Sequence, residues 1–231
     1  MSFNQAYSAP PPPPPRPPNR GSQRAINLPR AVGWLLVANV GIYVVVAAIP
    51  WSWEIWTILN LGFVPAKYSV AGAFDWTALA APLSHQFLHG GVVHLLVNMV
   101  MLAAFGSGVE RVLGTRRMLF LYFISGIAGG FAHWLFYPVS TVPVVGASGA
   151  ISGLFGAVLR LMALQGGAGG FLRILPVAVI WIGISVVVGF TGMPGTGEAQ
   201  IAWAAHIGGF LVGLLFFDLF TIGLRRRRPR E

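Results

Sequence analysis

The sequence predicts an all-α membrane protein, a bundle of six transmembrane helices with a long interfacial loop between the first and second helices. Composition is the first observation that predicts this class. Hydrophobic residues make up 55% of the 231 residues and charged residues only 9%, whereas about 25% of a soluble domain is charged. Segment length is the second observation, because the apolar residues gather in runs close to the roughly 20 residues that cross a bilayer.

The six predicted spans follow the apolar runs in chain order. They cover residues 31–49, 92–109, 118–136, 147–164, 172–190 and 202–222. The connection between the first two spans is interrupted by Pro65, Asp75 and Pro82, so it does not form a span of its own. Its tryptophans, among them Trp51 and Trp53, suit the headgroup zone of a bilayer. We therefore expect a structured loop that lies partly in the membrane interface.

Two polar tails flank the predicted membrane domain of residues 31–222. Residues 1–30 are rich in proline and arginine and cannot bury a core, which predicts disorder. They also lack the short apolar run of a signal peptide. Residues 223–231 are basic. The tails and the turns after the second and fourth spans hold 14 of the 15 basic residues. The positive-inside rule therefore predicts that both termini are cytoplasmic.

The same charge distribution indicates the partners of the chain. The formal net charge of +9 is spread over tails and short loops, where it meets lipid headgroups, and no basic patch on a soluble domain indicates nucleic acid. Cysteine is absent, so neither disulfides nor thiolate chemistry are expected. The oligomeric state is left open.

Four polar residues are predicted to lie at one depth in the membrane. With cytoplasmic termini, the second, fourth and sixth spans run from outside to inside. His94 and Asn98 then fall in the first turns of the second span, Ser148 at the start of the fourth, and His206 one turn into the sixth. Polar groups inside a bilayer usually face a bundle interior or a wet cavity. A polar pocket that opens outward follows.

Acyl transfer is the chemistry that this pocket fits. A serine hydroxyl is a weak nucleophile and needs a base within hydrogen-bond reach, and His206 is the candidate base for Ser148. His94 and Asn98 are four residues apart and share a helical face. Donors at this spacing can stabilise an oxyanion, a contribution of about 3–4 kcal/mol per donor. No acidic third member is evident, because Asp218 is three turns deeper and is expected to pair with arginines, so a serine–histidine dyad is predicted.

Several motifs together resemble the rhomboid family of intramembrane serine proteases. They are Gly146-Ala147-Ser148-Gly149, the His89, His94 and Asn98 pattern, Gly106-x-x-x-Glu110-x-x-x-Gly114, and Ala205-His206-x-x-Gly209-x-x-x-Gly213. The resemblance covers residues 51–218 and implies a six-helix core in which Ser148 is the nucleophile and His206 the general base. It implies an oxyanion hole made by the His94 and Asn98 side chains and the Ser148 backbone N–H. It also implies a supporting role for the remaining site residues, which are Gly146, Gly149, His89 and Gly209.

The resemblance further implies that the substrates are single-span membrane proteins, cut near the outer face of the membrane at small residues. No cofactor and no metal are implied. The compact six-span form predicts a bacterial inner membrane as the location. The sequence departs from the family at two positions. Ser152 stands where many relatives carry an aromatic residue that packs on the catalytic histidine, and Trp76-Thr77 stands where the family has a Trp-Arg pair.

Structural interpretations compete with the functional one. The spacing Gly149-x-x-x-Gly153 is typical of close helix packing in membranes. His85, His89 and His94 could suggest a metal site, but no HExxH motif or cysteine pair accompanies them. His133 is expected to be a packed or interfacial histidine, and Glu110 is expected to form a salt bridge with Arg111 that organises the loop.

Two other functions are possible for such a chain. The first is a non-catalytic relative that has the same fold and binds transmembrane segments. Such a relative would be recognised by the loss of the serine or of the base. The second is a small transporter, which is disfavoured because no broken-helix repeat or midplane charge is present.

Overall fold

The computed structural model describes residues 28–191 and 202–222. Within these ranges the chain forms helices and one isolated bridge, between Phe63 and Val144. The helices are α1 (Arg30–Ala48), α2 (Trp51–Leu61), α3 (Ala66–Ser69), α4 (Trp76–Ser84), η1 (His85–Phe87), α5 (Val92–Met101), η2 (Leu102–Gly106), α6 (Ser107–Leu113), α7 (Thr115–Phe136), α8 (Ser148–Gln165), η3 (Gly167–Gly169), α9 (Gly170–Thr191) and α10 (Trp203–Thr221). The predicted tails, residues 1–30 and 223–231, lie outside the described residues apart from residues 28–30.

In the part of the chain that the structure describes, six helical segments are long and apolar enough to cross a membrane. They are Arg30–Ala48, Val92–Leu113, Thr115–Phe136, Ser148–Gln165, Gly167–Thr191 and Trp203–Thr221. The second segment is built from α5, the π-helical turn η2 and α6. The predicted all-α, six-span fold class is therefore confirmed, with boundaries close to those expected.

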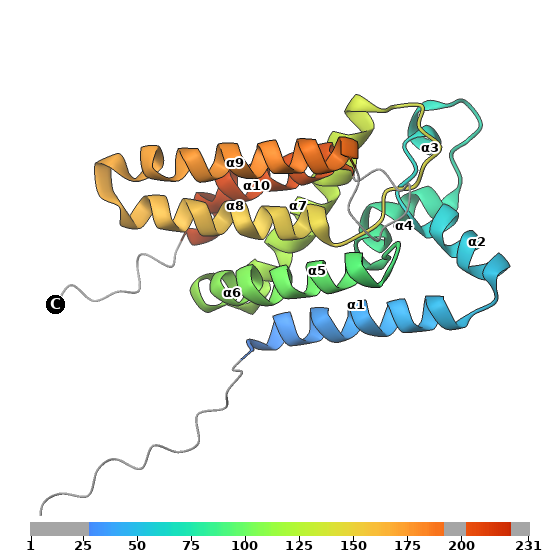
Figure 1. The fold of residues 1–231 in the computed structure, drawn as a ribbon, viewed down its shortest axis with the longest axis horizontal. Coiled ribbons are helices and arrows are strands. Elements are labelled where there is room, and N and C mark those ends of the chain that lie inside the picture. Colours follow the sequence, from blue (N-terminus) through green and yellow to red (C-terminus); the bar gives the residue numbers. More distant parts are fainter. Residues whose placement is uncertain (1–27, 192–201, 223–231) are drawn as a thin grey trace, which may run out of the picture.

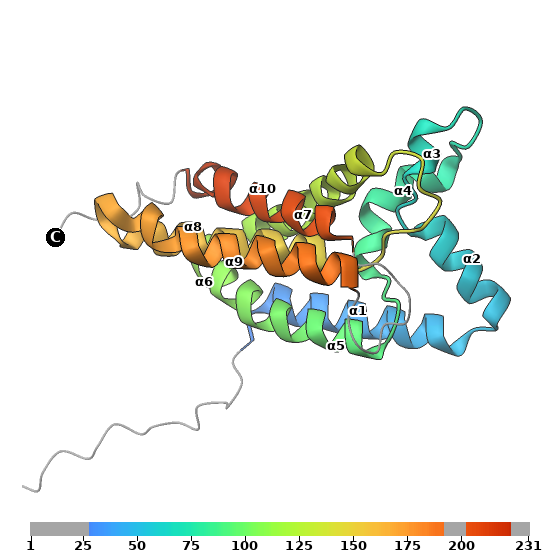
Figure 2. The same cartoon turned by 45° about the horizontal axis from the view of Figure 1, so that its top comes forward.

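The spans run roughly alongside one another, and the long connection after α1 gathers at one end of them. Figure 1 shows α8, α9 and α10 side by side, with α1, α5 and α6 below them and α7 behind. The short helices α2, α3 and α4 lie together at the right-hand end (Figures 1 and 2). The start of α1 and the end of α10 lie at the opposite end (Figure 1). The connection is thus a separate group of short helices, as the broken apolar pattern predicts.

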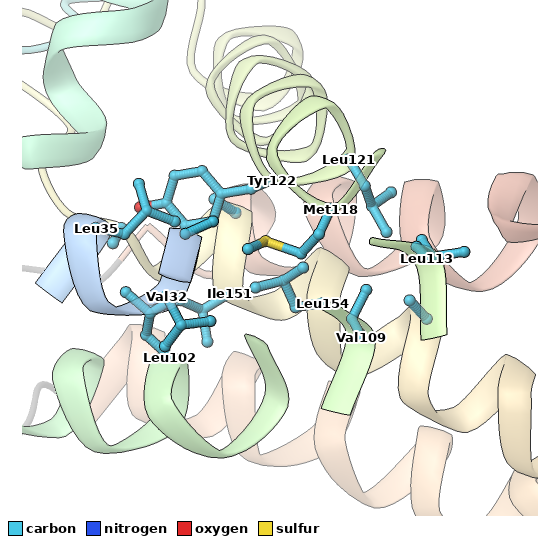
Figure 3. Close-up of a cluster of buried hydrophobic side chains, with 14 of the residues drawn as sticks. Val32, Leu35, Leu102, Val109, Leu113, Met118, Leu121, Tyr122, Ile151 and Leu154 are labelled. Atoms are coloured by element: carbon cyan, nitrogen blue, oxygen red, sulfur yellow. The ribbon is translucent and has the colours of Figure 1, made fainter. Parts of the chain in front are cut away.

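A cluster of buried apolar side chains joins α1, the second span, α7 and α8. Leu102, Met118, Tyr122 and Leu154 in this cluster are fully buried, and Figure 3 shows them gathered between η2, α7 and α8. Lipid tails are as apolar as these side chains, so their burial between helices gains little from the hydrophobic effect. Close packing and dispersion contacts hold the cluster together instead.

Helices α8 and α10 pack with their backbones in contact, because glycines line both of them. A Cβ atom added at Gly209 would overlap the carbonyl oxygen of Gly149, and one at Gly213 would overlap that of Gly153. A Cβ at Gly156 would overlap the carbonyl oxygen of Phe210. Small residues allow this approach in membrane helices. The packing interpretation of these glycines is therefore correct, and it brings the start of α8 beside the first turns of α10.

Polar side chains tie the helices at the end opposite α2–α4. The buried Glu110 carboxylate accepts hydrogen bonds from the backbone N–H groups of Ala31 and Val32 at 3.1 and 3.0 Å, and from the Thr115 hydroxyl at 2.7 Å. A carboxylate here satisfies N–H groups at the start of α1 that have no partner within the helix. Glu110 thus anchors the start of α1. The sequence predicts a salt bridge between Glu110 and Arg111 and does not predict this role.

Helix α10 is tied at the same end. Asp218 pairs with Arg160 of α8 at 2.5 Å, which confirms the predicted pairing with an arginine. Arg117 of α7 donates a hydrogen bond to the Ile222 carbonyl at 3.0 Å, just after α10 ends. These contacts fix the depth of α10 against α7 and α8.

Candidate active site

Ser148 is the first residue of α8, and its hydroxyl is 2.9 Å from Nε2 of His206 on α10. Two residues earlier the chain turns at Gly146, where φ is +121°, a conformation that residues with a side chain rarely adopt. This turn directs the chain into α8 with Ser148 at its beginning. The predicted serine and histidine therefore lie within hydrogen-bond distance, although 58 residues separate them in the sequence.

His206 lies in the first turn of α10, and neighbouring contacts fix that turn. Trp203 donates a hydrogen bond from Nε1 to the hydroxyl of Tyr137, the residue just after α7, at 3.0 Å. The Trp203 ring also packs on Phe136 and Phe190, with ring centroids 5.0 and 6.3 Å away. The start of α10 is thus held against the ends of α7 and α9.

The His94 and Asn98 side chains of α5 lie against the backbone that precedes Ser148. A Cβ added at Gly146 would be 2.8 Å from His94 Nε2 and 3.6 Å from Asn98 Nδ2. Asn98 is buried, and its Nδ2 has no hydrogen-bond partner in the part of the chain that the structure describes. A buried donor without a partner costs about 1–3 kcal/mol.

The other predicted supporting residues also meet at this point. The His89 ring contacts the His94 ring edge to face, with centroids 5.1 Å apart. Burial lowers the pKa of His89 to about 4, so the imidazole is neutral at pH 7. Gly149 lies against the carbonyl oxygen of Ala205, where an added Cβ would be 3.4 Å away, and Gly209 lies against Gly149.

His133 of α7 lies on the side of that helix that faces α10, which carries His206. The sequence predicts only a packed or interfacial histidine at this position. Gly129 and His133 are four residues apart and share one face of α7. Gly129 lies against the Ala205 backbone, and Tyr137, which follows directly after α7, accepts the hydrogen bond of Trp203, so this face is turned toward α10. The His133 ring packs on the Tyr137 ring, with ring centroids 4.8 Å apart. No signal in a single sequence sets this register between α7 and α10.

Ser152 is buried one turn into α8, and it presents no ring to His206. Among residues 28–191 and 202–222, no three histidine, aspartate or glutamate side chains are grouped so that they could hold a metal ion.

A further buried histidine, His85, gives a prediction for acid stability. Its Nδ1 donates to the Ala81 carbonyl at 2.8 Å, and burial lowers the pKa of His85 from 6.5 to about 4. Between these values the unfolded chain binds a proton that the folded protein does not, so stability falls as the pH drops from about 6.5 toward 4. The expected loss for this residue reaches about 3 kcal/mol.

We expect His85→Asn to remove part of this loss, because an amide N–H can replace Nδ1–H and does not titrate. Thermal unfolding of purified protein between pH 7 and pH 4.5 measures the effect. His89 titrates in the same window and remains in the variant, so a shallower slope is expected rather than a flat one. An unchanged slope in His85→Asn would contradict the prediction.

Comparison with known proteins identifies the family. The family model described as the Rhomboid domain matches residues 76–222. RHOMBOID-like protein 4 of Arabidopsis thaliana is 35% identical over 159 residues, which are 69% of this chain and 37% of that protein. Rhomboid protease GluP of Bacillus subtilis is 35% identical over 164 residues, 71% of this chain and 29% of that protein.

A third relative, Rhomboid protease GlpG of Pectobacterium atrosepticum, is 33% identical over 143 residues, 60% of this chain and 48% of that protein. The matches thus span less than half the length of each of these relatives. The chain is a multi-pass membrane protein that belongs to the rhomboid family and is homologous to bacterial rhomboid proteases.

Proposed function

We propose that this protein is an intramembrane serine endopeptidase that cleaves single-span membrane proteins through a Ser148–His206 dyad and an acyl-enzyme. The 2.9 Å distance between Ser148 Oγ and His206 Nε2 carries the proposal. It lies within the range over which a base can take a proton from a nucleophile. The names of the bacterial relatives GluP and GlpG as rhomboid proteases support the reaction class.

The reaction begins with the serine. His206 Nε2 accepts the Ser148 proton as Oγ attacks the scissile carbonyl carbon, which leaves a negative charge on the carbonyl oxygen. The Asn98 amide, the His94 imidazole and the Ser148 backbone N–H donate hydrogen bonds to this oxyanion. The Ser148 N–H has no acceptor within the helix because it begins α8, and the positive end of the helix dipole adds to the stabilisation.

The acyl-enzyme then forms and breaks down. The oxyanion collapses, the C–N bond breaks, and His206 gives its proton to the leaving amine. Water attacks the ester while His206 Nε2 takes one of its protons, and that proton returns to Ser148 Oγ as the C–O bond to the serine breaks. The products are two peptides and the free enzyme, so no cofactor is consumed.

We also propose that both termini are cytoplasmic, that cleavage occurs near the extracytoplasmic face, and that the membrane is a bacterial inner membrane. Arg30, Arg116, Arg117 and Arg160 belong to the half of the bundle where α1 begins and α10 ends. Ser148 begins α8 at the other end, where α2–α4 gather (Figure 1). The positive-inside rule supports this orientation.

Covalent labelling tests the reaction class. Purified protein reconstituted in lipid vesicles is incubated with a fluorogenic single-span substrate and, separately, with a fluorophosphonate probe. We expect cleavage that a chelator does not inhibit, together with probe attached at Ser148 in peptide mass mapping. A folded wild type that neither cleaves several substrates nor reacts with the probe would instead support the alternative, a non-catalytic relative that binds transmembrane segments.

Asn98→Ala is predicted to lower kcat by about 100-fold with little change in KM, because its amide bonds the oxyanion only in the transition state. The matched control is Val97→Ala, at a neighbouring position of α5 whose side chain is exposed. Steady-state cleavage of the fluorogenic substrate measures both constants. A change in KM alone would show that Asn98 binds substrate and does not stabilise the oxyanion.

A further inference from the structure

The segment before α8, residues 142–147, is held by hydrogen bonds to the connection that follows α1. Phe63 and Val144 exchange two backbone hydrogen bonds, of 3.0 and 2.8 Å. The Gly146 N–H donates to the His85 carbonyl at 2.9 Å. In Figure 1 this segment, drawn in yellow, runs past α3 and α4 before it enters α8. The residues immediately before Ser148 are therefore attached to the α2–α4 region.

Gly62 packs directly on the same segment. A Cβ added there would be 2.9 Å from the Pro143 Cβ and 3.2 Å from the Val145 Cγ1, and it would overlap the Ile58 carbonyl oxygen. The φ of Gly62 is −72°, which any residue adopts, so the requirement for glycine is one of space. Pro143 and Val145 are stiff side chains that cannot swing aside cheaply.

Phe63 and His85 are themselves fixed in the interior of the loop. Phe63 is fully buried, and its ring contacts those of Tyr68, Phe131 and His85 with centroids 4.8, 5.4 and 5.8 Å away. Phe131 belongs to α7, so the aromatic group links the loop to the bundle. A backbone attached to such a rigid cluster has little freedom to shift.

We propose that Gly62, Phe63 and His85 are positioning residues for Ser148. They hold residues 142–147 so that Ser148 Oγ meets His206 Nε2 and the backbone at Gly146 meets Asn98. This rests on the proposed function, because the consequence of a shift is measured on the reacting serine. Gly62 and Phe63 precede residue 76, where the match to the family model begins, and none of the three residues belongs to the motifs that carry the family resemblance.

The test is Gly62→Ala in the full-length protein, with Gly41→Ala as the matched control. Gly41 lies in α1, and a Cβ added there would meet nothing within 4 Å. We expect Gly62→Ala to lower kcat and the fluorophosphonate labelling rate per folded molecule by about 10- to 100-fold, the cost of a small misplacement of a reacting group. KM should stay within about twofold.

Amide hydrogen exchange gives a second, independent measurement. In Gly62→Ala we expect faster exchange at Val144 and Gly146, whose N–H groups bond to Phe63 and His85, without faster exchange in α8. Adding Val145→Ala to Gly62→Ala removes one of the colliding side chains and should restore part of the labelling rate.

The proposal is overturned if Gly62→Ala has the amide exchange, the labelling rate and the cleavage rate of the wild type. It is also overturned if the loss of labelling and cleavage is fully explained by a smaller fraction of folded protein. A wild type that neither labels nor cleaves would reject the proposed function. In that case faster exchange at Val144 and Gly146 in the variant still supports the attachment of the segment, and unchanged exchange rejects it.

Discussion

Replacing Ser148 with alanine is expected to abolish fluorophosphonate labelling and to lower kcat by at least about 10⁴-fold. Removal of the nucleophile of a serine protease leaves only the oxyanion donors and substrate binding to act on the reaction. His206→Ala is expected to cost a similar factor, because the hydroxyl 2.9 Å away then has no base. The two losses should not add in the double variant, since either change removes the same attacking alkoxide.

The control for both variants is Ser185→Ala, which removes a buried serine hydroxyl from α9. Cleavage is measured on equal amounts of folded protein in vesicles, with thermal unfolding as the check on folding. If Ser148→Ala keeps more than about one hundredth of the wild-type kcat, another nucleophile carries the reaction and the dyad is wrong.

The fold class follows from the sequence because span length and apolarity are local properties. Each predicted span matches one helix of the structure except the second, which α5, η2 and α6 form together, and the boundaries differ by a few residues. The grouping of Ser148, His206, His94 and Asn98 could also be expected, since topology alone sets their depth. That argument gives a depth along the membrane normal, and the 2.9 Å contact depends in addition on which faces of α8 and α10 meet.

Contacts that depend on register between distant segments could not be predicted. The pairing of Phe63 with Val144 joins residues in two irregular connections, where neither period nor motif indicates a partner. Nothing near Glu110 in the sequence indicated that its carboxylate accepts hydrogen bonds from the start of α1, nearly 80 residues earlier. The π-helical turn η2 likewise has no pattern in its sequence that predicts it.

Gly209→Ala is predicted to damage stability and activity together, because the contact between α8 and α10 sets the geometry of the dyad. The added methyl would overlap the carbonyl oxygen of Gly149, the residue after Ser148, and would be 3.1 Å from the carbonyl oxygen of Ser125. Backbone atoms cannot rotate away as a side chain can, so the helices must separate. Overpacking of this kind costs about 1–3 kcal/mol.

The activity loss should exceed the stability loss, since His206 lies one turn before Gly209 and moves with α10. We expect kcat per folded molecule to fall by more than about 100-fold as the Ser148–His206 contact lengthens. Gly183→Ala in α9 is the control, because an added Cβ there meets nothing within 4 Å and the same substitution should slightly stabilise a helix. Should Gly209→Ala unfold and label as Gly183→Ala does, the glycine contact would not be what holds serine and histidine together, and the aromatic contacts of Trp203 would have to supply that constraint.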